Sequence, residues 1–108
     1  MMRNIAGMMK KVQDMQDQFR VMQTDLAAMK FTAIVGGDTV SATVTGNGEL
    51  VKLKLNPENL DPGDIEMLQD MICLATNNAN RQAGEEKARM MKEITGDLPL
   101  PPGLNLPF

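Results

Sequence analysis

The chain has 108 residues, a formal net charge of -3, one cysteine and no histidine. This length allows one compact domain with a modest core, so we expect a homodimer to supply further buried surface. Without histidine, the chain lacks the commonest general base and the commonest neutral metal ligand, and it shows no Gly-rich phosphate-binding pattern. We therefore expect no enzyme, no metal site and no cofactor.

The hydropathy of the sequence predicts a protein of the cytoplasm. No apolar stretch approaches the roughly 20 residues of a membrane helix, and the start of the chain lacks the apolar run of a signal peptide. We expect no contact with a membrane. The single cysteine, Cys73, lies between Ile72 and Leu74, which predicts a buried and inert thiol.

The first part of the chain has apolar residues at alternating steps of three and four, with no proline before Lys30. This period predicts one helix from Asn4 to Lys30 with a coiled-coil-like seam for dimerisation or helix packing. Such a helix would be roughly 40 Å long, so part of it should project beyond a small sheet. Its methionines could instead form a groove for a partner helix, although core packing is their commoner role. The seam consists of Ile5, Met8, Val12, Met15, Phe19, Met22, Leu26 and Met29.

After Lys30 the apolar period changes to two, which predicts half-buried strands. Apolar and polar residues alternate over residues 40–45 and again over residues 51–55. Between them, Asn47-Gly48 is a preferred pair for a tight hairpin whose central residues need positive φ. A preceding strand around residues 31–35, with a turn at residues 36–38, completes a predicted three-stranded antiparallel meander.

A second long helix is expected after the sheet, with Asp61 as its N-cap and Pro62 at its first position. Its first half should be buried on the sheet, whereas residues 80–93 carry many charges and are expected to form a solvated extension. Two helical ends, residues 1–11 and 81–93, should therefore leave the core. The predicted buried face consists of Ile65, Leu68, Ile72, Ala75 and Ala79, widened by Met67, Met71 and Leu74.

The end of the chain is rich in proline, which excludes a regular helix. We expect a single α-β-β-β-α domain at residues 1–96 and a flexible tail at residues 97–108. The leucines and Phe108 of this tail could alternatively lie in an apolar groove. The predicted fold class is α+β: a long N-terminal helix, a three-stranded antiparallel meander, a second long helix and a Pro-rich tail.

Several local segments are also typical of one protein family. They are Lys10-Lys11-Val12-Gln13-Asp14-Met15-Gln16, Gly46-Asn47-Gly48-Glu49-Leu50, Leu55-Asn56-Pro57, Glu66-Met67-Leu68, Asn78-Ala79, Pro101-Pro102-Gly103 and Pro107-Phe108. In this order and spacing, over nearly the whole chain, the sequence resembles the bacterial YbaB/EbfC family of nucleoid-associated proteins. The resemblance implies a tweezer-like homodimer joined through its sheets, with helices projecting to contact double-stranded DNA. Replication or recombination proteins are a further class of partner that it leaves open.

DNA binding requires cations that can reach phosphates. The first candidates are Arg3, Lys10 and Lys11, which form a cluster without an acid, although exposed helices also carry such residues for solubility. A second set ranks lower because Glu85, Glu86 and Glu93 could pair with it at helical spacing. This second set consists of Arg81, Lys87, Arg89 and Lys92. For Lys52 and Lys54, protection of a strand from aggregation is a sufficient explanation.

The negative net charge restricts any DNA-binding surface to a local patch. Stacking on single strands is disfavoured, because the chain has three Phe, no Trp and no Tyr, and Phe19 belongs to the seam. The resemblance and the basic first turns together favour a nucleoid protein that binds duplex DNA with weak sequence preference, alters its conformation and regulates gene expression. The alternative is an adaptor that engages another protein through its coiled-coil-like helices or its tail.

Overall fold

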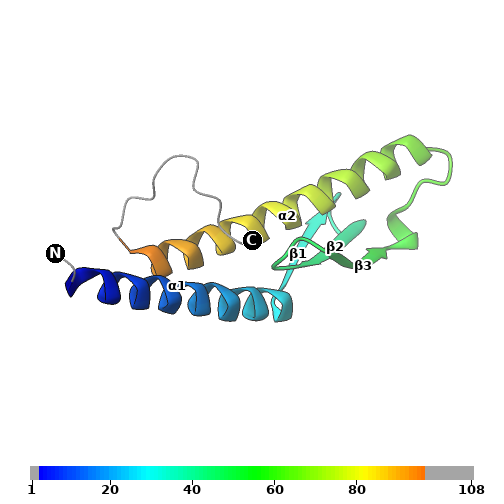
Figure 1. Cartoon of the computed structure of the whole chain (residues 1–108). Coiled ribbons are helices and arrows are strands. Elements are labelled where there is room, and N and C mark those ends of the chain that lie inside the picture. The colour runs from blue at the N-terminus through cyan, green and yellow to red at the C-terminus, as the bar shows by residue number, and fades with distance from the viewer. Residues whose placement is uncertain (1–2, 97–108) are drawn as a thin grey trace.

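The computed structural model describes residues 3–96, which form two long helices and a three-stranded antiparallel sheet (Figure 1). The elements are α1 (Arg3–Ala28), β1 (Lys30–Val35), β2 (Val40–Thr45), β3 (Leu50–Leu55), the 3-10 turn η1 (Pro57–Asn59) and α2 (Ile65–Thr95). The predicted α+β class and its order of elements are confirmed. The molecule is elongated, measuring 72 × 25 × 18 Å. The expected tail, residues 97–108, lies outside the described residues.

The junction between α1 and β1 comes earlier than predicted, because α1 ends at Ala28 and Lys30 is already the first residue of β1. The backbone amide of Gly46 donates to the carbonyl oxygens of Leu26, at 2.8 Å, and of Met29, at 3.2 Å. These bonds satisfy carbonyls that the end of a helix leaves without partners. They also attach the end of α1 to the loop between β2 and β3.

The sheet has the order β1-β2-β3, and Ala33, Ala42 and Leu53 lie side by side across it. The loop between β2 and β3 differs from the two-residue hairpin that Asn47-Gly48 suggested. The backbone amide of Thr45 donates to the carbonyl of Glu49 at 2.8 Å, and only Gly48 of the central pair has a positive φ, 89°. This is the longer hairpin loop in which a glycine in the left-handed region follows the turn.

The start of α2 is three residues later than predicted. Asp64, not Asp61, is the N-cap, and its carboxylate accepts from the backbone amide of Met67 at 3.0 Å. The carboxylate of Asp61 accepts instead from the amide of Gly63 at 2.9 Å. A helix beginning at Pro62 would hold Gly63 in its first turn, where glycine loses the most conformational freedom. The segment Asp61-Pro62-Gly63 therefore forms a turn before the helix.

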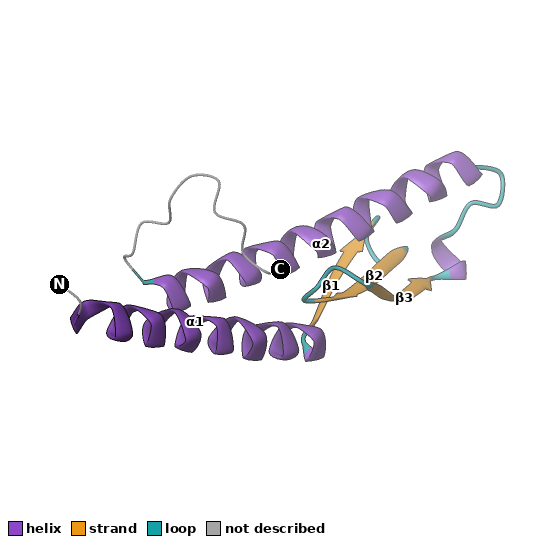
Figure 2. Ribbon diagram, viewed as in Figure 1, coloured by secondary structure: helices purple, strands orange, loops and turns teal. Residues whose placement is uncertain are grey.

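The first part of α2 covers β1 and β2 (Figure 2), where its alanines allow close packing. Ala75 packs with Val40 and Ala42 in one buried cluster, and Ala79 and Ala83 pack with other sheet residues in the next. Several residues of the predicted buried face are exposed, namely Ile65, Met67 and Leu74. Cys73 is exposed as well, so the prediction of a buried thiol is wrong. It lies two residues before Ala75, about 200° around the helix from the sheet.

The second part of α2 is not the solvated extension that its charges suggested. Ala83 is 2% exposed, and Met90, Met91 and Ile94 pack against a buried cluster of α1. The charged residues Glu86 and Lys87 interrupt this apolar face and are themselves half-buried. Long charged side chains can cover apolar surface with their methylene groups. The expected separation of residues 81–93 from the core is therefore wrong.

Neither α1 nor the described part of α2 contains a segment that is both long enough and apolar enough to cross a membrane.

Candidate nucleic-acid interface

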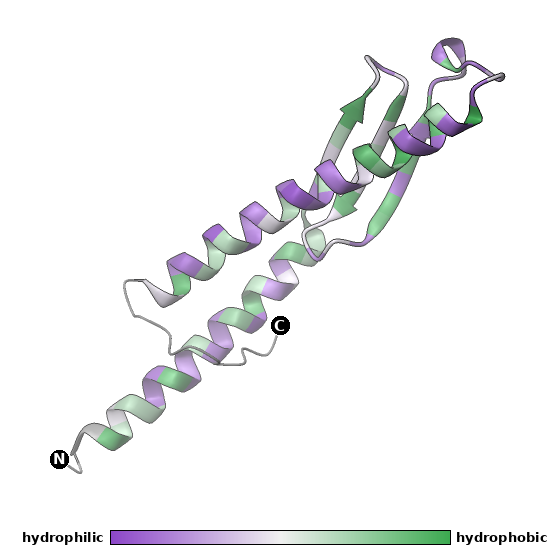
Figure 3. Ribbon diagram, turned by 90° about the horizontal axis from the view of Figure 1, so that it is seen from above, coloured by the Kyte–Doolittle hydropathy of each residue, from purple (hydrophilic) through white to green (hydrophobic). Residues whose placement is uncertain are grey.

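The two parts of α1 have different surroundings, although one apolar seam runs through both. In the packed half, residues 15–28, Phe19, Met22 and Leu26 are at most 3% exposed and contact the last turns of α2. In the projecting end, residues 3–14, the seam residues Ile5, Met8 and Val12 are more than half exposed. Figure 3 shows α1 running on past the end of α2. Met15 and Met29 are half-buried at the edges of the buried cluster.

The first set of candidate cations lies on the projecting end. Lys10 and Lys11 are exposed and form none of the ion pairs found among the described side chains. Arg3 is the first residue of α1, and its side chain lies outside the part of the chain that the structure describes. Asp14 follows one turn later, but no hydrogen bond or ion pair joins it to either lysine. Both ammonium groups are thus available to an anion.

The second set of candidate cations lies on α2 and is partly engaged. Arg89 bonds to Glu86 through Nε and to Glu93 through a terminal nitrogen, both at 2.5 Å. The hydrogen bond that Arg89 donates to Glu86, together with the charges of Glu86 and Glu93, raises the pKa of Arg89 above its ordinary value. Lys87 is half-buried and has an interaction partner. A phosphate would have to compete with these carboxylates, which disfavours both residues as DNA contacts.

The remaining cations of the second set are exposed but do not join the first set in one patch. Arg81 lies between Ala79 and Ala83, where α2 covers the sheet, whereas Lys92 lies where α2 packs on α1. Lys10 and Lys11 lie farther out, on the projecting end. The seven predicted cations are therefore distributed along the length of the molecule, and among those with described side chains Lys10 and Lys11 are an adjacent pair without ion pairs.

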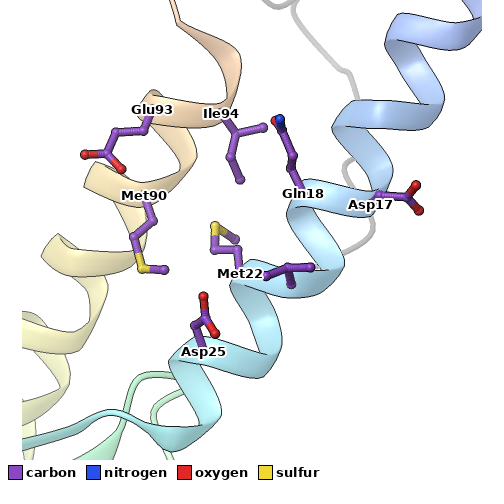
Figure 4. A pocket seen from close by; sticks show the side chains of 8 residues that line it. Asp17, Gln18, Met22, Asp25, Met90, Glu93 and Ile94 are labelled. Carbon is purple, nitrogen blue, oxygen red and sulfur yellow. The ribbon is translucent and has the colours of Figure 1, made fainter.

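The cleft between α1 and α2 does not suit a nucleic acid. Its volume is about 330 Å³, and the residues that line it include three acids, Asp17, Asp25 and Glu93. In Figure 4 the side chains of Met22, Met90 and Ile94 point toward one another between the helices. The acids would repel phosphates, and the methionines fill the space as part of the helix packing.

The open face of the sheet carries a basic surface that the sequence analysis did not include among the candidate DNA contacts. Lys52 and Lys54 pair with Thr43 and Ser41 on the side of the sheet opposite to α2, since their neighbours Leu53 and Leu55 pair with residues that contact α2. The hydroxyl groups of Thr32 and Thr43 bond to each other at 2.8 Å on this face. The strand register, which the alternation of residue types alone does not determine, brings these polar groups together.

Chemistry other than electrostatic contact has little support in the described residues. Within residues 3–96, no three Asp, Glu or Cys side chains are arranged so that they could hold a metal ion. The raised pKa of Arg89 follows from its ion pairs on α2 and does not indicate a reactive group. The exposed cations are the side chains that a ligand of opposite charge would meet first.

Comparison with known proteins identifies the family. The model of the YbaB/EbfC DNA-binding family matches residues 1–98. A nucleoid-associated protein of Clostridium acetobutylicum is 45% identical over 91% of this chain and 88% of its own length. Another from Gluconobacter oxydans is 40% identical over 99% of this chain and its whole length. An uncharacterized protein of Helicobacter pylori, whose crystal structure is known, has the same fold, with a TM-score of 0.72 and 24% identity over 85% of this chain and 94% of its own.

These matches cover the helices, the sheet and the segments on which the resemblance was based. The family is one of DNA-binding proteins and not of enzymes. The chain therefore belongs to the YbaB/EbfC DNA-binding family.

Proposed function

We propose that the chain is a nucleoid-associated protein that binds duplex DNA as a homodimer, with weak sequence preference, through the projecting end of α1. The observation that carries this proposal is the position of Lys10 and Lys11, which are exposed and without ion pairs on a part of the helix that no other described element covers. A helix end that projects from the body of the protein can reach a duplex without a clash between the sheet and the DNA.

The expected sequence preference is weak because two of the three proposed contacts, Lys10 and Lys11, are lysines. An ammonium group acts as a point charge and meets phosphates equally well in any sequence, and contacts to phosphates carry no sequence information. Binding of this kind releases counterions, so its affinity falls steeply as salt rises. Two projecting ends held at a fixed separation would also favour one curvature of the DNA, which is the basis for a proposed effect on DNA conformation and gene expression.

The homodimer is supported by apolar surface that the described chain leaves in water. Leu53 and Leu55 are 40% and 36% exposed, although they lie on the α2 side of the sheet. β3 is also an edge strand, whose outer backbone groups lack a neighbouring strand. Further apolar surface is exposed on α2, at Ile65, Met67 and Leu74. Apolar surface of this extent commonly marks a protein interface, and we assign it to a second copy of the chain.

The test is a salt titration of binding to a duplex of unrelated sequence. If Arg3, Lys10 and Lys11 of both subunits contact phosphates, log K should fall against log salt with a slope of about -5, because each contact contributes about -0.9. In the double variant Lys10→Glu/Lys11→Glu, four of these contacts are lost, so the slope should be less steep by about 4 units. Light scattering on the same samples gives the oligomeric state.

A matched control is the double variant Lys52→Glu/Lys54→Glu, which changes the net charge by the same amount on the open face of the sheet. Its slope should stay close to that of the unchanged chain. Equal losses in the two double variants would show that total charge, and not the projecting end, determines affinity. A flat titration of the unchanged chain would contradict DNA binding through phosphates altogether.

A further inference from the structure

An apolar stripe on the projecting end of α1 has no covering element among the described residues. Ile5, Met8, Met9 and Val12 are 55%, 66%, 60% and 53% exposed. Together with Gln13 and Gln16, they line a shallow groove along the helix. The stripe continues the seam that α2 covers farther along α1. Apolar side chains of this size at adjacent positions are costly to leave in water, which indicates that another segment covers them.

The last turn of α2 lies near the inner end of this stripe. Glu93 and Ile94 line the same cleft as Asp17 and Gln18, and Ile94 contacts the buried cluster to which Met15 belongs. α2 therefore ends about level with Asp17, and Ile5 lies twelve residues farther out, or roughly 18 Å along the helix. Gly96, with a φ of 60°, ends α2 there.

The sequence that continues from this point has a suitable length and composition. Residues 97–108 contain Leu98, Leu100, Leu104, Leu106 and Phe108, with four prolines and one acid. Twelve residues span up to about 40 Å when extended, about twice the distance that the stripe requires. Proline also restricts the unbound chain, so less conformational entropy is lost when the segment is held in an extended form.

We propose that residues 97–108 of the same chain pack along the stripe of Ile5, Met8, Met9 and Val12 on α1. The segment would cover the α1 seam in the projecting end, as α2 covers it in the packed half. Lys10 lies about 200° around the helix from Val12, so a segment on the stripe leaves this cation accessible. The covered stripe would keep the projecting end from associating with other apolar surfaces while its basic side remains exposed.

The stripe fits a tethered segment better than a second copy of α1. Four side chains cannot supply the ~800 Å² per partner that a stable interface between separate molecules requires. A segment attached at Gly96 needs less area, because a short tether holds it near the stripe at an effective concentration of about millimolar. The stripe is also narrow and straight, which suits a single extended segment.

The experiment compares disulfide formation from the tail to two faces of α1 in the full chain. All variants carry Cys73→Ser, and all carry Asn105→Cys, which lies between two leucines and replaces no apolar residue. The first variant adds Val12→Cys, on the stripe. The matched control adds Asp14→Cys, two residues away and about 200° around the helix, so that the tether reaches both positions equally. We expect intramolecular oxidation to be at least about tenfold faster for the pair with Val12→Cys.

Each outcome decides the proposal. Faster oxidation at the stripe, with the product at monomer mass in a denaturing gel, supports it, and replacing both Leu104 and Leu106 with Ser should then abolish the preference. Equal rates on the two faces, or none, overturn it, because a tail that is not held on the stripe meets both sites alike. A product mainly at dimer mass overturns it as well and assigns the stripe to the tail of a second copy. None of these readouts depends on DNA.

Discussion

The packed half and the projecting end of α1 have the same apolar period but differ in how deeply their apolar side chains are buried. Phe19, Met22 and Leu26 are buried under α2, whereas Ile5, Met8 and Val12 lie beyond its end and are more than half exposed. A periodic seam thus shows which side of a helix will be covered, but not by what or how far. The covering element is fixed by where the other helix ends, which depends on the whole fold.

The largest expected effect comes from truncating a fully buried side chain of the packed half. Leu26 is fully buried, so Leu26→Ala should leave a cavity and lower the free energy of unfolding by about 2–5 kcal/mol. Chemical denaturation measures this change at a fixed protein concentration, because the stability of the proposed dimer would depend on concentration.

The corresponding change in the projecting end provides the comparison. Val12→Ala removes a branched side chain that is 53% exposed, and it should lower the free energy of unfolding by less than about 1 kcal/mol. Similar losses at the two positions would mean that a partner buries the projecting end as deeply as α2 buries the packed half.

A further prediction concerns the attachment of the packed half to the sheet. A Cβ atom at Gly46 would lie 2.5 Å from the carbonyl oxygen of Leu26 and 2.8 Å from its Cα, both atoms of the backbone. Gly46→Ala should therefore push the end of α1 away from the loop between β2 and β3 and cost about 1–3 kcal/mol. Hydrogen exchange should become faster through the packed half. Unchanged protection of residues 15–28 would show that this close approach does not hold α1 in place.

The type and order of the elements followed from the sequence because periodicity and turn residues act locally. The period of α1, the alternation in β2 and the glycines of the loops all depend on neighbours within a few residues. The start of α2 was wrong by three residues because Asp61 and Asp64 both precede plausible first turns. The bonds that they accept distinguish them, because Asp64 accepts from the amide of Met67 and Asp61 accepts from the amide of Gly63.

The environment of the second part of α2 could not be predicted from its composition. Ala79, Ala83, Met90 and Ile94 fall on one side of the helix, but Glu86 and Lys87 interrupt that side and hide the pattern. Cys73 shows the reverse error, since apolar neighbours in sequence suggested burial for a residue that faces away from the sheet. Both errors arise because burial depends on the direction of a side chain relative to a distant element.

The sequence predicted only part of the candidate interface. The absence of acids within residues 1–11 marked Lys10 and Lys11, which the structure shows to be exposed and without ion pairs. The pairing of Arg89 with Glu86 and Glu93 was visible as helical spacing, but whether those pairs form depends on rotamers that the spacing does not fix. The basic face with Lys52 and Lys54 required the strand register.

The smallest expected effects test whether the projecting end of α1 unfolds together with the core. A Cβ atom added to Gly84 in α2, or to Gly7 in the projecting end, would meet nothing within 4 Å beyond the backbone of its own helix, so alanine fits at both positions. Gly84→Ala should raise the free energy of unfolding by about 0.5–1 kcal/mol, because glycine loses more conformational freedom in a helix. Gly7→Ala should slow hydrogen exchange in the first turns of α1 and leave global unfolding nearly unchanged, because a helix end outside the core opens without the rest of the molecule. If both substitutions raise global stability equally, the projecting end unfolds together with the core, and the distinction between the two parts of α1 is one of exposure alone.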